Sequence, residues 1–394
     1  MRPVSKLPRN VWILGFVSLL MDLSSEIYHA LLPAFITVTL ALPVVALGAI
    51  DGIAEATASF AKLASGRLSD RSRRRKPLVL LGYGLAALSK PLFPIAQGAF
   101  ELMGARFADR VGKGIRGAPR DAIIADETPP DMRGRAFGLR QALDTVGAMI
   151  APLAAVGLMI VLSGDIRSVF WIAAIPAALS FLLALVAVKE PVTHWATTKV
   201  QPFFRGFRDL DKPTRRLLAV AFLFSLARFS EGFLILRAMD FGASATLSPL
   251  ALVIFNLGFF ALAYPAGSLS DRMNPRTILM CGMGVLVAAN LILAQDFGIA
   301  GLAVGILLWG AHMALTQGIF ARMIADVAPD HLQATSFGAF YFVSGIGTLL
   351  ASVAAGFIWD RDGATTTFLA AAGAAAVAAT MLSLITESRP TPAR

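Results

Sequence analysis

One short motif occurs twice in this chain, as Gly66-Arg-Leu-Ser-Asp70-Arg71 and again, 201 residues later, as Gly267-Ser-Leu-Ser-Asp271-Arg272. Other matches share nearly the same register, at an offset of 200 residues: Ile124-Ala-Asp126 with Ile324-Ala-Asp326, Phe137-Gly138 with Phe337-Gly338, and Gly147 with Gly347. A tandem repeat of this length predicts that the chain consists of two halves with the same architecture.

The composition indicates an integral membrane protein. Of 394 residues, 56% are hydrophobic and only 15% are charged, whereas soluble domains average about 45–50% apolar and about 25% charged residues. A bilayer requires about 20 apolar residues per helix. Twelve such runs follow one another, six in each half: 11–38, 43–64, 77–96, 99–120, 136–161, 168–188, 216–239, 246–265, 278–295, 299–320, 336–358 and 364–386. We therefore expect an all-α membrane fold of twelve transmembrane helices in two pseudo-symmetric six-helix bundles.

The positive charges fix the expected orientation. With the N-terminus in the cytoplasm, the inner segments carry 24 Lys and Arg residues and the outer loops carry 2. Positive residues favour the cytoplasmic side, so both termini are predicted to be cytoplasmic. The same bias accounts for the net charge of +10 without a nucleic-acid partner.

The polar stretch 189–215 divides the spans and is predicted to be a cytoplasmic linker between an N-terminal bundle (1–188) and a C-terminal bundle (216–394). Cys281 is the single cysteine, which excludes a disulfide framework. We expect no metal site and no cofactor.

The repeated loop motif resembles the signature of the major facilitator superfamily. The residues that carry the resemblance are Gly66, Asp70, Arg71 and Arg74 in the first half and Gly267, Asp271 and Arg272 in the second. The resemblance implies a transporter with gates at these loops. Asp70 would face the start of the span 336–358, where a helix N-terminus favours an anion, and Asp271 would do the same near the span 136–161.

Two further segments, Asp22-Leu-Ser-Ser-Glu26 and Asp109-Arg-Val-Gly-Lys-Gly-Ile-Arg116, resemble a large bacterial group of that superfamily with mostly unassigned substrates. The resemblance implies a multi-pass protein of the bacterial inner (cytoplasmic) membrane. We expect a monomer in the lipid bilayer.

Charged residues inside the predicted spans are concentrated in the first half. Unpaired, each costs about 2.5–3.5 kcal/mol at the membrane centre, so they are expected to pair or to face water. Deep within the spans, the first half has eleven charged residues, and at comparable depth the second half has two, Arg228 and Glu231. The eleven are Asp22, Glu26, Asp51, Glu55, Lys90, Arg106, Asp109, Arg110, Lys113, Arg140 and Asp144.

Helical spacing places six residues of the fourth span on one face, namely Arg106, Asp109, Arg110, Lys113, Arg116 and Arg120. The acids of the first two spans also share faces, and His29 lies with Asp22 and Glu26. The pattern predicts one coupled network of acids and bases. For single residues a structural role stays open: Arg116 and Arg120 as solvated helix ends, Lys90 snorkelling to the outer surface, His29 as a hydrogen-bonding residue, and Arg140 and Asp144 as partners of the fourth span.

The functional interpretation assigns two roles. Arg106, Arg110, Lys113, Arg228 and Asn256 are predicted to bind substrate, because Arg presents a fork that suits carboxylates and phosphates. Asp22, Glu26, Asp51, Glu55 and Asp109 are predicted to carry the coupling protons, because a carboxylate released by its Arg partner gains proton affinity.

The sequence therefore predicts a secondary active transporter, and not an enzyme, that moves a small organic solute by alternating access with protons as the coupling ion. The basic stripe favours an anionic or amphipathic substrate. The acids would also serve a proton-exchanging multidrug or cation efflux transporter, which stays open as the alternative. A membrane-embedded enzyme lacks a nucleophile or metal constellation, a channel would lack paired gates, and a primary pump would need a phosphate-binding loop.

Overall fold

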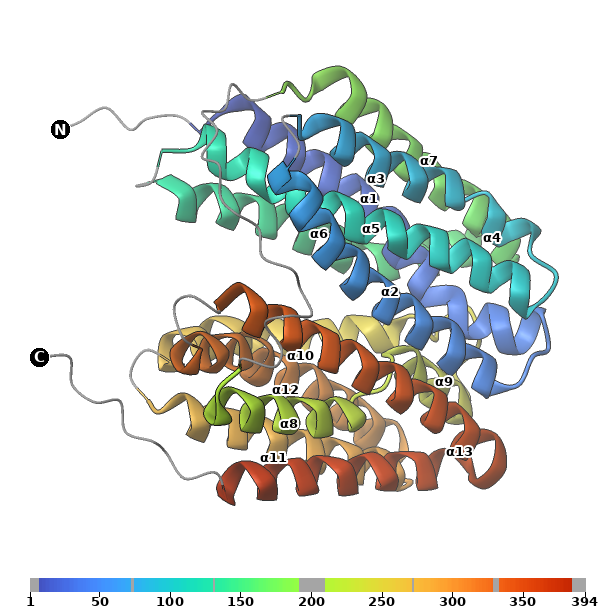
Figure 1. Ribbon diagram of the computed structural model, residues 1–394. Coiled ribbons are helices and arrows are strands. Elements are labelled where there is room, and N and C mark those ends of the chain that lie inside the picture. Colours follow the sequence, from blue (N-terminus) through green and yellow to red (C-terminus); the bar gives the residue numbers. More distant parts are fainter. Residues whose placement is uncertain are drawn as a thin grey trace, which may run out of the picture. The chain divides into compact units, whose positions relative to one another are not determined.

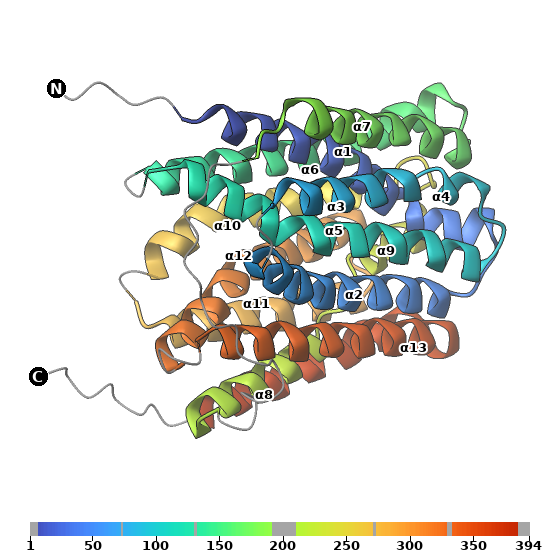
Figure 2. The same ribbon diagram turned by 45° about the horizontal axis from the view of Figure 1, so that its top comes forward.

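The computed structural model describes residues 7–71, 74–129, 132–190, 210–270, 273–328 and 333–384. Within these ranges the chain is helical almost throughout and contains no strand (Figures 1 and 2). The predicted all-α fold is confirmed.

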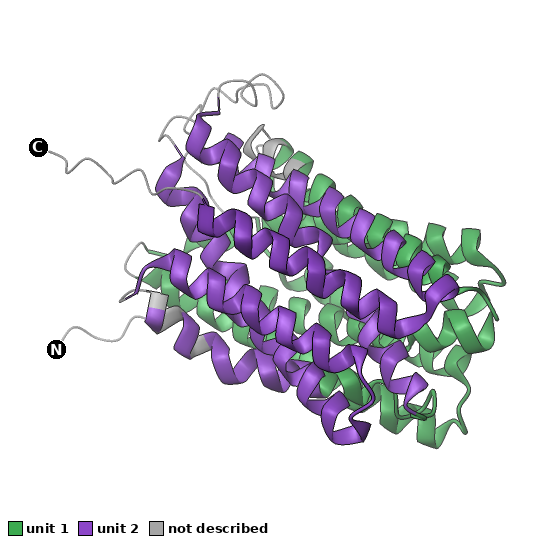
Figure 3. Ribbon diagram, turned by 90° about the horizontal axis from the view of Figure 1, so that it is seen from below, with its two compact units in different colours: residues 1–200, 242–253 green, residues 201–241, 254–394 purple. Residues whose placement is uncertain are grey.

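The chain divides into two compact units (Figure 3). Unit 1 contains residues 1–200 and 242–253, and unit 2 contains residues 201–241 and 254–394. Most of the predicted linker lies outside the described residues, which stop at Glu190 and resume at Leu210.

Unit 1 supplies the first six spans. Two of them are extended by short pieces, a π-helical turn after the first and one extra turn after the third. The elements are α1 (Arg9–Ala34), η1 (Phe35–Thr39), α2 (Val44–Arg71), α3 (Lys76–Ser89), α4 (Leu92–Ile95), α5 (Ala99–Glu127), α6 (Arg133–Val161) and α7 (Ile166–Ala187).

The last six spans follow in α8 (Lys212–Leu226), α9 (Gly232–Asp240), α10 (Leu250–Ser270), α11 (Pro275–Ala294), α12 (Gly298–Val327) and α13 (Gln333–Leu384). Gly363, with φ 84°, turns the chain inside α13 and separates its two spans, because a left-handed backbone conformation suits glycine. The predicted continuous span 216–239 is wrong in one respect. It is interrupted between Leu226 and Gly232, and α8 and α9 lie on either side.

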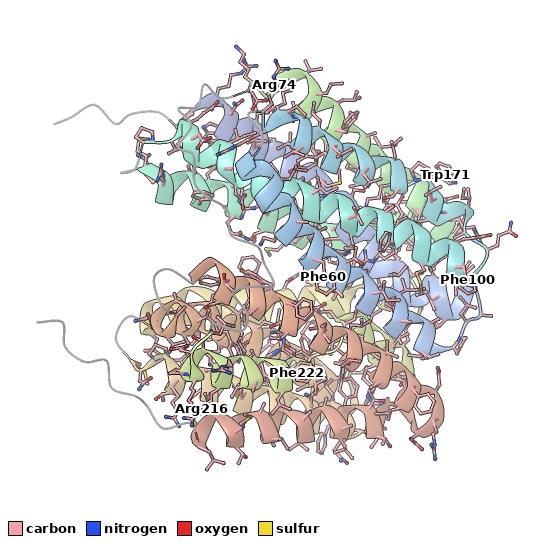
Figure 4. All side chains as sticks on the ribbon, in the orientation of Figure 1. Phe60, Arg74, Phe100, Trp171, Arg216 and Phe222 are labelled. Carbon is pink, nitrogen blue, oxygen red and sulfur yellow. The ribbon has the colours of Figure 1, made fainter. Side chains whose placement is uncertain are left out.

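Apolar side chains cover the outside of the helices, as a lipid environment requires. Phe100 is 90% exposed and Trp171 is 49% exposed, and both project outward from unit 1 in Figure 4. By length and composition, eight helical segments among the described residues could cross a membrane. The helix α5 is not one of them. Its charged stripe makes it too polar to face lipid alone, so it depends on the neighbours that surround it.

The repeat is visible in the packing. A Cβ atom on Gly147 of α6 would lie 2.7 Å from the backbone oxygen of Leu19 in α1. Its counterpart Gly347 in α13 would place a Cβ atom 3.0 Å from the backbone oxygen of Phe222 in α8. Both glycines therefore allow the first and fifth helices of their unit to approach closely. The same register produces the same contact twice, as the tandem repeat predicts.

This close approach generates a paired prediction within one helix. Gly147→Ala is expected to lower stability by about 1–3 kcal/mol, because the added methyl group overpacks the α1–α6 contact. Gly157→Ala in the same helix meets nothing within 4 Å, so it is expected to be neutral or to stabilise by about 0.5–1 kcal/mol through helix propensity. Thermal unfolding of the purified protein in detergent measures both. Equal effects of the two variants would contradict the assignment.

Candidate functional site

Several charged residues of α5 are buried against neighbouring helices of unit 1. The helix α5 packs between α2 and α3 (Figures 1 and 2). The glycines of α5 permit this, since a Cβ atom on Gly112 would lie 2.6 Å from the backbone oxygen of Gly82 in α3, and one on Gly114 would lie 2.8 Å from that of Ala58 in α2. The short distances bring the α5 side chains within reach of acids on two neighbouring helices.

A fully buried layer of ion pairs joins α2, α3 and α5. The Lys90 ammonium lies 2.9 Å from Asp109 Oδ1, and Arg106 Nη2 lies 3.0 Å from Asp51 Oδ1, with all four side chains at most 2% exposed. Arg106 Nη1 also lies 4.0 Å from Asp109 Oδ2, which connects the two pairs. Each buried charge in this layer thus has a countercharge, as a membrane interior demands.

The position of Lys90 differs from the one predicted. The prediction that Lys90 snorkels to the outer surface is wrong, because its side chain is completely buried. Its ammonium lies 3.0 Å from Ser25 Oγ and 4.9 Å from the centroid of the Tyr28 ring. Together with Asp109, these groups replace the water that a snorkelling lysine would seek. The sequence showed Asp109 and Lys90 on different spans but not their proximity.

A second layer of charges contains acids that are partly exposed. Glu55 is 48% exposed and lies 3.3 Å from Arg110 Nη1. Asp22 is 24% exposed and lies 4.0 Å from Arg116 Nη2. Glu26 is half-buried, and Lys113 is exposed and acts electrostatically on Asp22 and Glu55. The predicted network therefore consists of a sealed layer and a second layer in which the acids and Lys113 are at least partly exposed. The two layers are connected through the buried Arg110, whose Nε lies 3.8 Å from Asp109 Oδ2.

The rest of the basic stripe is also tied into unit 1. Arg116 is buried against the Tyr83 ring, 4.8 Å from its centroid, and Arg120 donates to Ser18 Oγ at 2.7 Å. A role as solvated helix ends is therefore wrong for both. His29 Nδ1 lies 3.1 Å from Arg106 Nη2, which confirms its hydrogen-bonding role.

Arg140 and Asp144 pair mainly with each other. Arg140 Nη1 lies 2.7 Å from Asp144 Oδ2 within α6, and Arg140 Nε lies 3.9 Å from Asp121 Oδ1 of α5. The predicted link to the fourth span is thus made by Arg140.

Unit 2 holds the remaining predicted substrate residues. Arg228 lies at the interruption between α8 and α9 and donates to Met313 Sδ of α12 at 2.9 Å. Asn256 is half-buried in α10. Its chain neighbour Phe255 has its ring centroid 5.8 Å from that of Trp309.

The predicted gate residues are only partly described. Gly66, Asp70 and Arg71 belong to the last turns of α2 and Gly267 to the last turns of α10, but nothing is described of the Asp70 and Arg71 side chains. Asp271 and Arg272 lie outside the described residues. Arg74 is exposed and points outward from unit 1 (Figure 4). The gating roles stay predictions.

A polar cluster at the end of unit 1 was missed by the sequence analysis. Glu190 accepts hydrogen bonds from the backbone N–H groups of Arg75, at 2.6 Å, and Lys76, at 3.0 Å, and so caps α3. The Arg75 guanidinium lies 2.5 Å from Asp126. Asp126 belongs to the repeated Ile-Ala-Asp segment, so the repeat was the available signal for this cluster.

Asn10 extends the cluster from α1. Its Nδ2 donates to Glu127 Oε1 at 2.6 Å and to the backbone oxygen of Lys189 at 2.8 Å. Burial raises the pKa of Glu127 above its ordinary value of 4.5, while the hydrogen bond from Asn10 opposes that shift and the charge of Asp126 reinforces it. This end of unit 1 is therefore held by side chains from α1, α5 and the segment after α7.

Known proteins with similar sequences and folds are membrane transporters or uncharacterized relatives of transporters. The sequence model of the Major Facilitator Superfamily matches residues 14–239 and 217–394 of this chain. An uncharacterized transporter of that type from Methanocaldococcus jannaschii is 31% identical over 363 residues, which cover 90% of this chain and 89% of the relative. The multidrug resistance protein MdtL of Escherichia coli is 25% identical over 290 residues, which cover 69% of this chain and 71% of MdtL.

Among solved structures, the nucleoside transporter NupG superposes with a TM-score of 0.77 at 15% identity, over 95% of this chain and 98% of that chain. This likeness shows the fold. Within the described residues, no group of three or more His, Cys, Asp or Glu side chains is placed to hold a metal ion.

The buried layer generates a stability prediction. Asp109→Asn or Lys90→Met leaves the other charge buried without its partner, so each is expected to cost about 3–5 kcal/mol, and the double replacement is expected to cost less than the sum. Thermal unfolding of the three variants measures this coupling. Lys113→Gln, at an exposed position, is the control and is expected to unfold like the parent. Additive single effects would contradict a direct pair.

Glu127 generates a pH prediction. Because its folded-state pKa is raised, the folded protein gains stability from protonation that is fully present below pH 4.5 and is lost as the pH rises through the raised pKa. Glu127→Gln lacks this loss of stability. The melting temperature of the variant, relative to that of the parent, is therefore expected to increase as the pH rises from 4 to 7. Asn10→Ala removes a hydrogen bond that opposes the shift and is expected to steepen the loss. Parallel pH profiles would contradict the role of Glu127.

Proposed function

Because the chain belongs to the major facilitator superfamily, and is thus a membrane transport protein, we propose that it is a secondary active transporter that moves a small organic solute, anionic or amphipathic, by alternating access with protons as the coupling ion. We further propose that it works as a monomer in a bacterial inner membrane, with both termini in the cytoplasm.

The observation that carries this proposal is the division of the unit 1 charges into two layers. Asp51, Arg106, Asp109 and Lys90 are sealed from solvent and paired with one another. A residue that binds substrate or exchanges protons must be accessible to the substrate or the proton. We therefore assign these roles to residues of the second, partly exposed layer. Arg106, Asp51 and Asp109 then serve mainly to position the groups beside them.

Lys113 and Arg110 are the basic residues best placed to bind an anion. Lys113 is exposed. The Arg110 side chain is only 3% exposed, but it lies 3.3 Å from Glu55, an acid that is 48% exposed. A substrate carboxylate that bound Arg110 would compete with Glu55 for the same guanidinium. Arg forms bidentate hydrogen bonds with carboxylates, so such an exchange is chemically matched.

Proton coupling follows from this competition. A carboxylate that loses its cationic partner gains proton affinity, so substrate binding at Arg110 would promote protonation of Glu55. Asp22 stands in a similar relation to Arg116, at 4.0 Å, and Glu26 lies one turn further along α1. We propose these three accessible acids as the proton carriers.

One observation favours the alternative of proton-exchanging drug efflux. The similar protein MdtL is a multidrug resistance protein, and the same accessible acids would attract a cation. The two functions differ in which residue the solute needs. An anion needs Lys113 and Arg110, whereas a lipophilic cation needs the acids alone.

Transport by reconstituted protein tests the proposal. Proteoliposomes that contain a pH-sensitive dye are exposed to membrane-impermeant dicarboxylates and aromatic sulfonates, and separately to lipophilic cations. We expect an anion to drive proton movement in the parent. In Glu55→Gln, substrate exchange is expected to continue while the accompanying proton movement is reduced. In Lys113→Gln, the substrate KM is expected to rise by about ten-fold or more, since a charge-assisted hydrogen bond contributes about 1.5–3 kcal/mol.

Arg361→Gln, which removes an exposed positive charge from the turn within α13, is the matched control and is expected to transport like the parent. Proton movement driven by cations alone, unaffected by Lys113→Gln, would replace the anion proposal with drug efflux. Proton movement that persists unchanged in Glu55→Gln would overturn the coupling role of that residue.

A further inference from the structure

The interruption between α8 and α9 is an unusual feature at membrane depth. The residues from Ala227 to Glu231 leave the helix in the middle of a predicted span. In a bilayer, non-helical backbone is tolerated where it is buried in protein or lines a polar cavity, and interrupted helices in transporters often mark binding sites. The chemistry of the surrounding side chains therefore needs an explanation.

The backbone at the interruption is held by specific hydrogen bonds. The Ser230 N–H donates to Ser352 Oγ of α13 at 3.2 Å, and the Gly232 N–H donates to Ser230 Oγ at 3.1 Å, at the start of α9. The helix is thus stopped and restarted in a fixed geometry. This geometry places Arg228 beside α12.

Among the described residues, the Arg228 guanidinium has a weak acceptor and one unsatisfied nitrogen. Its Nη2 donates to a sulfur, Met313 Sδ, and a thioether is a weak acceptor. Its Nε is buried without a hydrogen-bond partner among the described residues, and its Cζ lies 5.8 Å from the centroid of the Phe224 ring. Glu231 acts on Arg228 electrostatically. A charge in this setting is costly, so an external anion would be stabilised here.

One face of α12 adds two more unsatisfied nitrogens. Trp309, His312 and Met313 follow helical spacing, and the first two are at most 1% exposed. Trp309 Nε1 and His312 Nε2 are both buried without a partner in the described part of the chain. His312 Nδ1 contacts the backbone oxygen of Trp309. Because a carbonyl oxygen only accepts, Nδ1 bears the proton and Nε2 is left as an acceptor.

Aromatic rings surround these polar atoms. The His312 ring lies 4.6 Å from the Trp309 ring and 6.4 Å from the Phe224 ring, centroid to centroid. The Trp309 ring is flanked by Phe229 at 6.3 Å and by Phe255 at 5.8 Å. The environment thus combines one cationic donor, one neutral donor and one acceptor with apolar walls.

We propose that the interruption in unit 2 is a subsite for the carboxylate of an aromatic acid that carries a neighbouring hydroxyl group. Arg228 Nε and Trp309 Nε1 donate to the carboxylate, and His312 Nε2 accepts from the hydroxyl. The inference deepens the proposed function by naming a substrate class, and rests on it for the presence of an organic solute. It draws only on residues of unit 2.

Ligand binding to the purified full-length protein tests the subsite. Thermal unfolding in detergent is measured with salicylate, benzoate and benzyl alcohol, since selective binding to the folded state raises its melting temperature. We expect salicylate to stabilise more than benzoate, and benzyl alcohol to have no effect. Arg228→Gln is expected to weaken the binding of salicylate and of benzoate by about ten-fold or more. His312→Phe is expected to abolish the preference for salicylate. Arg322→Gln, which removes a half-buried charge paired with Asp326 on the same helix, is the control.

A readout on the unmodified protein guards against variants that fail to fold. With 15N-labelled tryptophan, the indole N–H resonance of Trp309, assigned through Trp309→Phe, is expected to shift on addition of salicylate and to stay unchanged with benzyl alcohol. An unshifted Trp309 resonance at salicylate concentrations that stabilise the protein would overturn the subsite, as would equal stabilisation by all three compounds.

The subsite and the proposed function can fail separately. If Lys113→Gln abolishes stabilisation by the aromatic acids while Arg228→Gln leaves it intact, the subsite is wrong and the unit 1 anion site stands. If salicylate binds as expected but no anion drives proton movement in proteoliposomes, the subsite stands and the proposed coupling is wrong.

Discussion

Charges inside a membrane must be paired, and in this protein the pairing of Lys90 with Asp109 and of Arg106 with Asp51 meets that requirement for unit 1. The helix α5 is too polar to face lipid, so it can be in the membrane only while α2 and α3 supply countercharges. Removing one partner would leave an isolated buried charge, which costs several kcal/mol. The glycines that bring α5 close to both neighbours are part of the same constraint, because ion pairs of about 3 Å need closely packed backbones.

The two units share an architecture but differ in the polar side chains that they bury. In both, a glycine at the equivalent register position allows the first and fifth helices to meet. Unit 1 then buries, between α2, α3 and α5, charges that neutralise one another. Unit 2 surrounds Arg228 with aromatic rings, a sulfur and nitrogens without partners among the described residues. A repeat preserves the packing contacts that the fold needs, while the polar side chains are free to diverge towards different binding chemistry.

The functional proposals follow from which charges can be reached. A sealed ion pair stabilises the unit but cannot exchange its partner without disrupting the packing around it. Glu55 and Lys113 are accessible, so a solute or a proton can compete for them at low cost. The sealed layer would then hold the open layer in a fixed geometry, as binding sites in general require support from the groups behind them. The end cluster around Asn10 and Glu190 links α1, α3 and α5 with the segment after α7 by hydrogen bonds.

The sequence by itself determined the spans, the repeat and the one-sided stripe of α5, because hydrophobic length and helical periodicity are local properties. It also indicated that the intramembrane charges of the first half form a network. It did not determine which charges are sealed: Lys90 was expected at the surface and is buried, and Arg116 was expected in solvent and lies against Tyr83. Nor did it show the interruption at Arg228, which Ser352 from a distant helix helps to fix. These features depend on contacts between residues far apart in the chain, so only the tertiary structure could decide them.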